Sequence, residues 1–225
     1  MNLLGFETSS ALGSVALATP RGLLVREITT PREQTERLLA LTDELLAEAG
    51  ITLEQLHGIA FGRGPGSFTG LRVSVAVAQG LAAVTAVPLL AVSSLACLAQ
   101  RACREHGCER GIVCVDAHMG EVYWAEFGVQ DGMAGIVGAE RLSPPAEVAA
   151  LPGEGWCAVG NGFAAHGEAL AAVARAAARV LPELVPSAAD LFPQARLDLA
   201  AGRGAAATAA LPKYLREHTA WRRTS

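Results

Sequence analysis

The sequence predicts an α/β protein built from two similar halves, and three observations support this class. The first half alternates short apolar runs with helical patterns in the order strand, strand, strand, helix, strand, helix, strand, helix. The second half opens with Ile112–Asp116 as the first opens with Leu3–Glu7: an apolar strand, an acidic residue, a short turn with glycine and a return strand. Hydrophobic residues make up 51% of the 225 residues, enough for a large core. We therefore expect two α/β units around a cleft.

Strands are expected where short apolar runs are bounded by turn residues, and the turn Thr8–Gly13 joins the first two as a β-hairpin. The expected strands are Leu3–Glu7, Ser14–Ala18, Leu23–Thr29, His57–Phe61, Pro88–Val92, Ile112–Asp116, Glu121–Phe127 and Cys157–Gly160.

The helix Pro31–Ala49 has the clearest boundaries of the expected helices. Thr30 can cap its first turn, Pro31 fits the first helical position, and Glu33 can complete a capping box. Gly50 follows its last turn. The other expected helices are Thr69–Ala83, Ser93–Glu105, Pro144–Leu151, Phe163–Leu181 and Ser187–Gly202.

The turn Gly107–Glu109 separates the two matching halves. It predicts an N-terminal lobe over residues 1–107 and a C-terminal lobe over residues 108–225, the latter ending in a polar tail after Leu211.

Charge and cysteine content restrict the function. With 18 basic and 22 acidic residues the net charge is −4, which argues against independent nucleic-acid binding. The five cysteines form no C-x-x-C pair and are odd in number, which favours free, buried thiols in a reducing compartment. Met1–Gly5 lacks the basic start of a signal peptide, so the cytoplasm is the expected location.

Residues 73–100 contain no charged side chain, and a run of this length could span a bilayer. However, much of the run is Ala, Ser and Thr, and Pro88 interrupts it. Small residues at Gly70, Ser74, Ala78 and Ala82 also share one helix face, where another backbone can approach closely. We therefore expect a buried helix, strand and helix, and no membrane span.

A glycine-rich loop precedes the second helix, and its main residues are Gly64, Pro65, Gly66, Ser67 and Gly70. Backbone amides at such a place can bind an anion. The same glycines can also serve only as a tight turn that lets the helix pack. The loop lacks the Gly-Lys-Ser/Thr of a Walker A motif and the spacing of G-x-G-x-x-G.

Glu7 and Asp116 end equivalent strands of the two halves. Facing each other, and with Thr8 and Ser9, they could hold a hydrated Mg²⁺ or orient water on a phosphate. The alternative is that each carboxylate accepts hydrogen bonds from amides of its own turn.

The sequence predicts no metal site and no nucleophile. No H-x-x-x-H pair exists and no G-x-S-x-G surrounds a serine. The histidines are therefore expected to be surface or structural residues: His57, His106, His118, His166 and His218.

The motifs Gly64–Val73 (GPGSFTGLRV) and Glu7–Ser10 (ETSS) resemble the TsaB (YeaZ-type) family. Further matches are Gln34–Leu39, Asp116–Tyr123 and Pro212–Arg216, so the resemblance extends along the whole chain. It implies a duplicated, two-lobed actin-like/Hsp70-like (ribonuclease H-like) ATPase fold.

The resemblance also implies a function. Members of this family are non-catalytic, essential subunits of the complex that adds a threonylcarbamoyl group to the adenosine next to the anticodon in tRNA. A TsaD-like paralogue would be the catalytic partner and a TsaE-like ATPase a further one, with tRNA bound indirectly and ATP or ADP only in the assembled complex. The H-x-x-x-H metal pair of that paralogue falls here on Ser94 and Leu98, so neither catalysis nor metalloprotease activity is expected.

Family members bind this partner, or a second copy of themselves, through the first two helices of the N-terminal half. The alternative is that the apolar stripes of these helices cover the chain's own sheet. The residues expected at the interface are Thr35, Leu38, Leu39, Thr42, Leu45, Leu46, Leu71, Ser74, Val75 and Ala78.

The other function left open is an ATPase or phosphotransferase of the same fold that uses Glu7 and Asp116. The chain departs from the family pattern at Glu7, where aspartate is usual, and the longer side chain would displace a phosphate-bound metal. The other departures are Gln34 for His, Ser74 for Gly, His118 for Arg and Lys213 for a small apolar residue.

Overall fold

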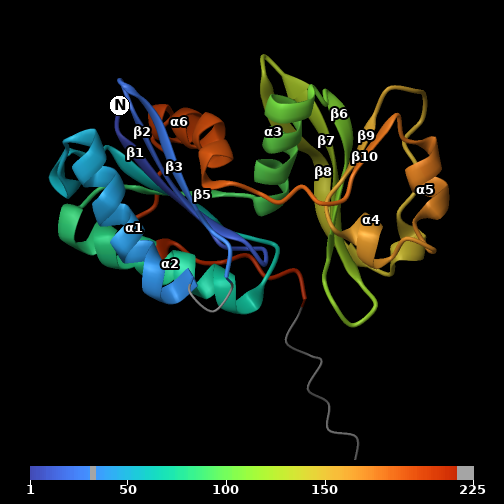
Figure 1. Cartoon of the computed structure of the whole chain (residues 1–225), viewed down its shortest axis with the longest axis horizontal. Coiled ribbons are helices and arrows are strands. Elements are labelled where there is room, and N and C mark those ends of the chain that lie inside the picture. Colours follow the sequence, from blue (N-terminus) through green and yellow to red (C-terminus); the bar gives the residue numbers. More distant parts are fainter. Residues whose placement is uncertain (31–33, 217–225) are drawn as a thin grey trace, which may run out of the picture.

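The computed structural model describes residues 1–30 and 34–216 and contains two five-stranded sheets that lie side by side (Figure 1). The first sheet comprises β1 (Leu3–Glu7), β2 (Gly13–Thr19), β3 (Gly22–Ile28), β4 (Gly58–Gly62) and β5 (Leu89–Val92). The second comprises β6 (Arg110–Asp116), β7 (Val122–Gln130), β8 (Met133–Ser143), β9 (Cys157–Val159) and β10 (Arg179–Leu181).

The two sheets have the same topology. Their orders are β3-β2-β1-β4-β5 and β8-β7-β6-β9-β10, and the first three strands in sequence are antiparallel in each. The fourth strand then pairs in parallel with the first, and the fifth in parallel with the fourth. This confirms the duplicated, two-lobed α/β fold expected from the matching openings of the two halves.

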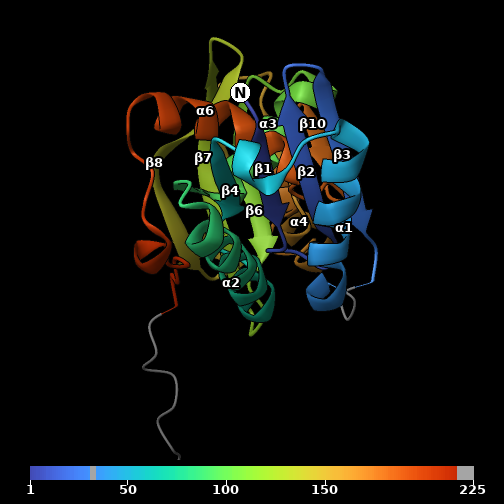
Figure 2. The same ribbon diagram turned by 90° about the vertical axis from the view of Figure 1, so that its left-hand side faces the viewer.

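Helices cover both faces of each sheet, as Figures 1 and 2 show. α1 and α2 pack on the outer face of the first sheet, and α6 lies on its inner face. α3 packs on the inner face of the second sheet, and α4 and α5 lie on its outer face. The helices are α1 (Gln34–Ala49), α2 (Phe68–Thr85), α3 (Ser94–His106), α4 (Gly162–Ala165), α5 (Ala171–Ala176) and α6 (Phe192–Ala200).

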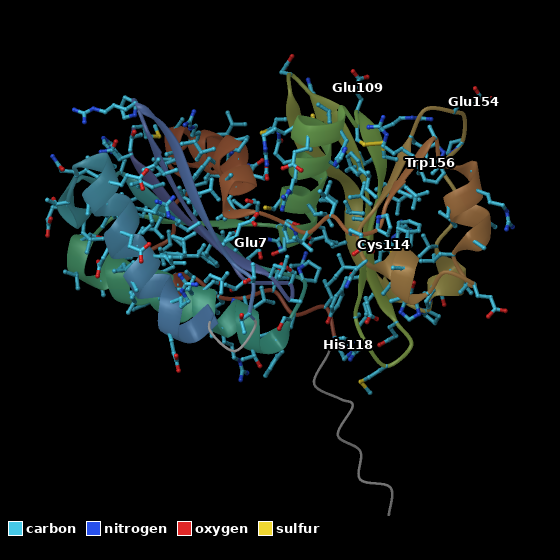
Figure 3. All side chains as sticks on the ribbon, viewed as in Figure 1. Glu7, Glu109, Cys114, His118, Glu154 and Trp156 are labelled. Carbon is cyan, nitrogen blue, oxygen red and sulfur yellow. A yellow bond between two sulfur atoms is a disulfide. The ribbon has the colours of Figure 1, made fainter. Side chains whose placement is uncertain are left out.

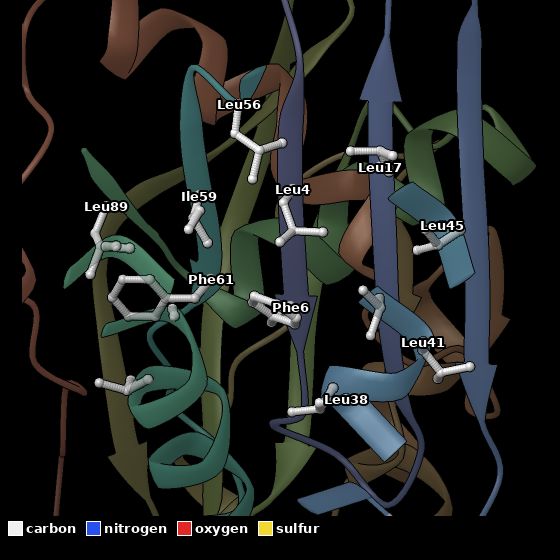
Figure 4. Close-up of a cluster of buried hydrophobic side chains, with 14 of the residues drawn as sticks. Leu4, Phe6, Leu17, Leu38, Leu41, Leu45, Leu56, Ile59, Phe61 and Leu89 are labelled. Carbon is white, nitrogen blue, oxygen red and sulfur yellow. The ribbon is translucent and has the colours of Figure 1, made fainter. Parts of the chain in front are cut away.

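The largest core lies between the first sheet and the helices α1 and α2 (Figure 4). Leu38 and Leu45 of α1 belong to the same buried cluster as Leu4 and Phe6 of β1, and all four side chains are fully buried. Each such side chain contributes roughly 1.5–3 kcal/mol through removal from water. The leucine stripe of α1 therefore belongs to the chain's own core.

The packing of helices does not follow the order of the chain. α3 comes from the first half, yet Leu95 and Leu98 on this helix pack in the core of the second sheet. α6 comes from the second half, yet Phe192 and Ala195 pack against the first sheet. Each half of the chain thus contributes one helix that packs on the sheet of the other half. The domain boundary at residue 107 stays a prediction.

The structure differs from the expected elements mainly in the second half. The helix expected over Pro144–Leu151 is only a 3-10 turn, Pro145–Glu147. The helix expected over Phe163–Leu181 divides into α4, α5 and β10, because its last residues pair with β9 as the edge of the sheet. The helix expected over Ser187–Gly202 divides into a 3-10 turn, Ala188–Leu191, and α6. β8 was not expected, because Gly135 and Gly138 weaken its strand pattern.

The uncharged run forms part of α2, the strand β5 and part of α3, as the sequence predicts. Within the described residues, α2 is the one helix that meets the length and hydropathy of a membrane span. In this structure its small-residue face is buried in the protein, including Gly70, Ser74, Ala78 and Ala82. The predicted cap residues Pro31 and Glu33 of the first helix lie outside the described residues.

A disulfide joins Cys108 and Cys157, whose Cα atoms are 6.0 Å apart (Figure 3). The expectation that all five cysteines are free is wrong for this pair, and Cys97, Cys103 and Cys114 are the free thiols. The two partners are 49 residues apart in sequence, and the folded second sheet brings them together.

Candidate functional site

Glu7, the first candidate for a phosphate or metal site, ends β1 and is completely buried. Its carboxyl group accepts hydrogen bonds from the amide of Ser9 at 2.7 Å and from the hydroxyl of Ser94 at 3.1 Å. Burial raises the pKa of Glu7 in spite of these hydrogen bonds, because the ionised carboxylate loses its water. A raised pKa favours the uncharged carboxyl, which is a poor ligand for Mg²⁺.

The glycine loop fills the space beside Glu7. A Cβ atom on Gly62 would lie 2.0 Å from Oε2 of Glu7, and one on Gly66 would lie 2.5 Å from the carbonyl oxygen of Ser9. A Cβ atom on Gly70 would lie 1.9 Å from the carbonyl oxygen of Thr8. These glycines are therefore required because the turn after β1 packs directly on the loop.

Three amides of the loop and the helix start, those of Gly64, Ser67 and Gly70, have partners within the chain. The amide of Ser67 donates to the carbonyl of Ser9 at 2.7 Å, and the amide of Gly64 donates to the hydroxyl of Ser94 at 3.2 Å. The hydroxyl of Thr8 donates to the carbonyl of Gly70 at 2.7 Å. This network supports the structural interpretation of the loop.

Asp116 ends β6, the equivalent strand of the second lobe, and unlike Glu7 it is only partly buried. Its carboxylate accepts a hydrogen bond from the amide of His118 at 2.9 Å, as the alternative interpretation predicts. It also contacts the rings of His166 and His118, each at 3.0 Å. Burial works to raise the pKa of Asp116, but the contacts with His166 and His118 outweigh it and the pKa is lowered. Glu7 and Asp116 share no partner among the described residues, and Figure 3 shows Glu7 in the first lobe and His118 in the second.

His166 is the partner that sequence reasoning missed at this place. It lies 50 residues from Asp116, immediately after α4, and the amide of Asp116 also donates to Oδ1 of Asn161 at the start of α4. No local motif links these positions, so their proximity comes only from the fold.

Ser94 and Leu98, the positions that correspond to the metal pair of the paralogue, have packing roles. Ser94 is buried at the start of α3 and connects Glu7 to the glycine loop, while Leu98 is buried in the core of the second sheet. Within residues 1–30 and 34–216, no group of three or more His, Cys, Asp or Glu side chains is placed to hold a metal ion.

The predicted interface residues need correction, because the structure buries most of them inside the chain. The side chain of Leu39 on α1 is 51% exposed, and that of Thr35 lies outside the described residues. The 3.6-residue period of a helix produces the same stripe for a core and for an interface, and here the core interpretation is right. The buried residues are Leu38, Thr42, Leu45, Leu46, Leu71, Ser74, Val75 and Ala78.

The opposite side of α2 instead forms a shallow apolar groove, which we call the α2 outer face. The guanidinium carbon of Arg72 lies 3.7 Å from the ring centroid of Phe68, and the side chain of Phe68 is 47% exposed. The ring of Tyr214, near the C-terminus, lies 5.3 Å from that of Phe68. The α2 outer face is lined by Phe68, Thr69, Arg72, Val73, Ala76 and Val77.

A further group that the sequence did not single out connects the two lobes at Glu140 on β8. Its side chain is 3% exposed and forms ion pairs with Arg63 at 3.2 Å and with Lys213 at 2.7 Å. It also accepts a hydrogen bond from the hydroxyl of Ser93. Burial works to raise the pKa of Glu140, but Lys213, Ser93 and Arg63 lower it. Lys213, a departure from the family pattern, thus has a buried partner.

Comparison with known proteins gives a consistent family. A family model described as TsaD, tRNA N6-adenosine threonylcarbamoyltransferase, matches residues 25–222. The TsaB protein of Escherichia coli K12 is 36% identical over 99% of this chain and 98% of its own length. A threonylcarbamoyltransferase of Bordetella pertussis is 35% identical, but over 42% of this chain and 32% of its own.

Comparison with solved structures indicates the same family. YeaZ from Pseudomonas aeruginosa has a TM-score of 0.87 and 40% identity, covering 95% of this chain and 99% of that one. A second Pseudomonas aeruginosa structure, described as similar to peptidase YeaZ, has a TM-score of 0.88 over 96% of this chain. These likenesses show that the chain shares the fold of YeaZ, which here has two lobes of the same sheet topology. The chain therefore belongs to the TsaB (YeaZ-type) family of tRNA threonylcarbamoyladenosine biosynthesis proteins.

Proposed function

We propose that this chain is a non-catalytic subunit of the complex that adds the threonylcarbamoyl group to the adenosine next to the anticodon in tRNA. Its role is to bind and activate a TsaD-like catalytic paralogue in the cytoplasm. A TsaE-like ATPase completes the complex, ATP or ADP binds only after assembly, and tRNA is held mainly by other subunits. The net charge of −4 is consistent with this indirect role.

One observation carries the proposal: the internal network around Glu7 and Ser94. In this network the glycine loop packs on the turn after β1, Ser94 donates to Glu7, and the amides of Gly64 and Ser67 donate within the chain. Opening this place for a nucleotide would break these hydrogen bonds and leave buried polar groups unpaired, which costs stability. The place that would serve chemistry in an ATPase of this fold thus serves stability here.

The α2 outer face is the surface we propose for the catalytic paralogue, together with Leu39 of α1. It combines half-exposed apolar side chains with an aromatic ring and an arginine, a composition typical of protein interfaces. A second copy of the chain is the competing occupant. Paralogue and copy would use the same face, so they would exclude each other.

Reconstitution from purified components tests the role. The TsaD-like paralogue, the TsaE-like ATPase and tRNA are assayed with ATP and a threonylcarbamoyl donor, with and without this chain, and we expect modification only with it. If the paralogue reaches full activity without this chain, the proposed function is wrong.

A matched pair of charge insertions tests the surface. Ala76 lies on the α2 outer face and Ala83 is exposed two turns further along the same helix. We expect Ala76→Glu to weaken binding of the paralogue at least about tenfold, because a carboxylate must then be buried in an apolar contact. Ala83→Glu should leave affinity within about twofold. Equal effects of the two substitutions would refute the proposal that the α2 outer face binds the paralogue.

The alternative, an ATPase or phosphotransferase that uses Glu7 and Asp116, is tested on the chain alone. The full chain is assayed for ATP hydrolysis beside the isosteric variants Glu7→Gln and Asp116→Asn. The proposal expects no hydrolysis above background from any of them. A measurable rate that either substitution abolishes would establish the alternative.

A further inference from the structure

The last described segment of the chain crosses from the first lobe to the second. Before it, the amide of Ala205 donates to the carbonyl of Leu89 at 2.8 Å, and Gln79 of α2 donates to the carbonyl of Ala210 at 2.8 Å. These contacts hold residues 205–210 against the first lobe. We call the following residues, Leu211–Arg216, the strap (Figure 1).

The middle of the strap is fixed between the two lobes. The amide of Lys213 donates to the carbonyl of Arg63, directly after β4, at 2.7 Å. The ammonium group of the same residue donates to Glu140 on β8 at 2.7 Å. One residue of the strap thus joins the glycine-loop region of the first lobe to a strand of the second sheet.

Glu140 strengthens the connection between the lobes, because its partners other than Lys213 come from the first half of the chain. Arg63 binds the carboxylate through two nitrogen atoms at 3.2 and 3.3 Å, and Ser93 caps α3 while donating to it. A carboxylate that is 3% exposed needs such compensation, because an unpaired charge there would be costly. The charged groups that contact Glu140 are Arg63 and Lys213.

The end of the strap is anchored to the second lobe. The guanidinium group of Arg216 donates to the carboxylate of Glu121 at 2.6 Å and to the carbonyl of Ala117 at 3.2 Å. Both partners belong to the turn between β6 and β7, the turn that follows Asp116. Loss of this anchor would free the strap at its second-lobe end.

Tyr214 connects the strap to the α2 outer face. Its ring packs on Phe68, and its hydroxyl accepts a hydrogen bond from Nε of Arg72 at 3.2 Å. The side chain of Tyr214 is 38% exposed, so a molecule that covers the α2 outer face can bury the rest of it. The strap therefore contacts a proposed partner surface and the joint between the lobes at the same time.

We propose that the strap is a coupling element: when docked it fixes the orientation of the two lobes, and binding of a partner to the α2 outer face stabilises the docked state. The coupling rests on the proposed function, because its partner is the TsaD-like paralogue. Linkage requires reciprocity, so undocking the strap must weaken partner binding. The opposite arrangement, in which Tyr214 blocks the surface, would make undocking strengthen binding.

The first experiment uses the full chain without a partner. Arg216→Ala removes the second-lobe anchor. Arg203→Ala is the control, because Arg203 pairs with Asp198 of α6 and lies outside the strap. Hydrogen exchange is followed at the amide of Lys213, which donates to Arg63 in the docked strap. We expect exchange about tenfold faster in Arg216→Ala and unchanged in Arg203→Ala. Unchanged exchange in Arg216→Ala would overturn the strap as a docked element.

The second experiment measures binding of the TsaD-like paralogue to the same variants and to Glu121→Gln, which removes the negative charge that pairs with Arg216 on the second lobe. We expect Arg216→Ala and Glu121→Gln to weaken binding at least about threefold, and Arg203→Ala to leave it unchanged. Tighter binding, unchanged binding, or an effect of Arg216→Ala alone would overturn the coupling. If the unaltered chain does not bind the paralogue, the proposed function and the coupling both fail, while the exchange result still decides whether the strap holds the lobes.

Discussion

The turns after β1 and β6 occupy the same place in the duplicated fold, yet their acidic residues have opposite environments. Glu7 is completely buried against the glycine loop. The side chain of Asp116 contacts two histidines and is partly exposed to solvent. The loop after the fourth strand explains the difference. In the second lobe a Cβ atom on Gly160 or Gly162 would meet Cys114 rather than the turn, so that loop packs earlier on the strand and leaves Asp116 accessible. In this chain, packing of that loop accounts for the burial of one acid and the partial exposure of the other.

The largest expected effect on stability comes from disrupting the contact between the start of α2 and the turn after β1. Gly70→Ala places a Cβ atom 1.9 Å from the carbonyl oxygen of Thr8, so the helix and the turn must separate. We expect the free energy of unfolding to fall by about 3 kcal/mol or more. Chemical denaturation followed by circular dichroism measures the change.

Gly80→Ala in the same helix is the control. A Cβ atom on Gly80 meets nothing within 4 Å, so this variant should gain roughly 0.5–1 kcal/mol from helix propensity. If Gly70→Ala gains stability as Gly80→Ala does, the predicted clash with the carbonyl oxygen of Thr8 is wrong.

The second effect concerns a covalent bond of the second lobe. The disulfide between Cys108 and Cys157 links the turn between α3 and β6 to β9 across 49 residues. Cys108→Ser should lower the free energy of unfolding by about 2–4 kcal/mol under oxidising conditions. Cys103→Ser, at a free and half-buried thiol, should have little effect. A reductant should remove most of the difference between Cys108→Ser and the unaltered chain, and a difference that persists under reduction would contradict a role for the bond.

The sequence was informative where one signal had one structural meaning. Short apolar runs placed β1 at its observed bounds, Leu3–Glu7, and the repeated opening with an acid and a turn revealed the duplication. It was ambiguous for the stripe that contains Leu38, because a core and an interface require the same spacing. It contained no signal for the pairing of Asp116 with His166, or of Glu140 with Arg63 and Lys213, because the partners are 50 to 77 residues apart.

The third prediction concerns the pH dependence of the buried acid. Because the pKa of Glu7 is raised above its ordinary value of 4.5, its contribution to stability is fully present below that pH and is lost as the pH rises through the folded-state pKa. Glu7→Gln keeps the shape of the side chain without the charge. We expect it to match the unaltered chain at pH 4 and to exceed its stability at pH 8 by about 1 kcal/mol. Thermal unfolding across this pH range measures the difference, and a variant that is less stable at pH 8 would contradict a raised pKa.

The smallest effect, with the opposite sign, is expected at Asp116. Its pKa is lowered from an ordinary value of 3.8, so the stability it contributes is present above that pH and is lost as the pH falls through the folded-state pKa. Asp116→Asn should therefore be less stable than the unaltered chain at pH 7, by under about 1 kcal/mol because the group is partly solvated. The difference should vanish in acid, where both side chains are uncharged. At neutral pH we therefore expect Glu7→Gln to raise stability and Asp116→Asn to lower it. Equal signs would mean that the loop after the fourth strand does not set the environment of the acid, and the contrast between the two turns would then need another cause.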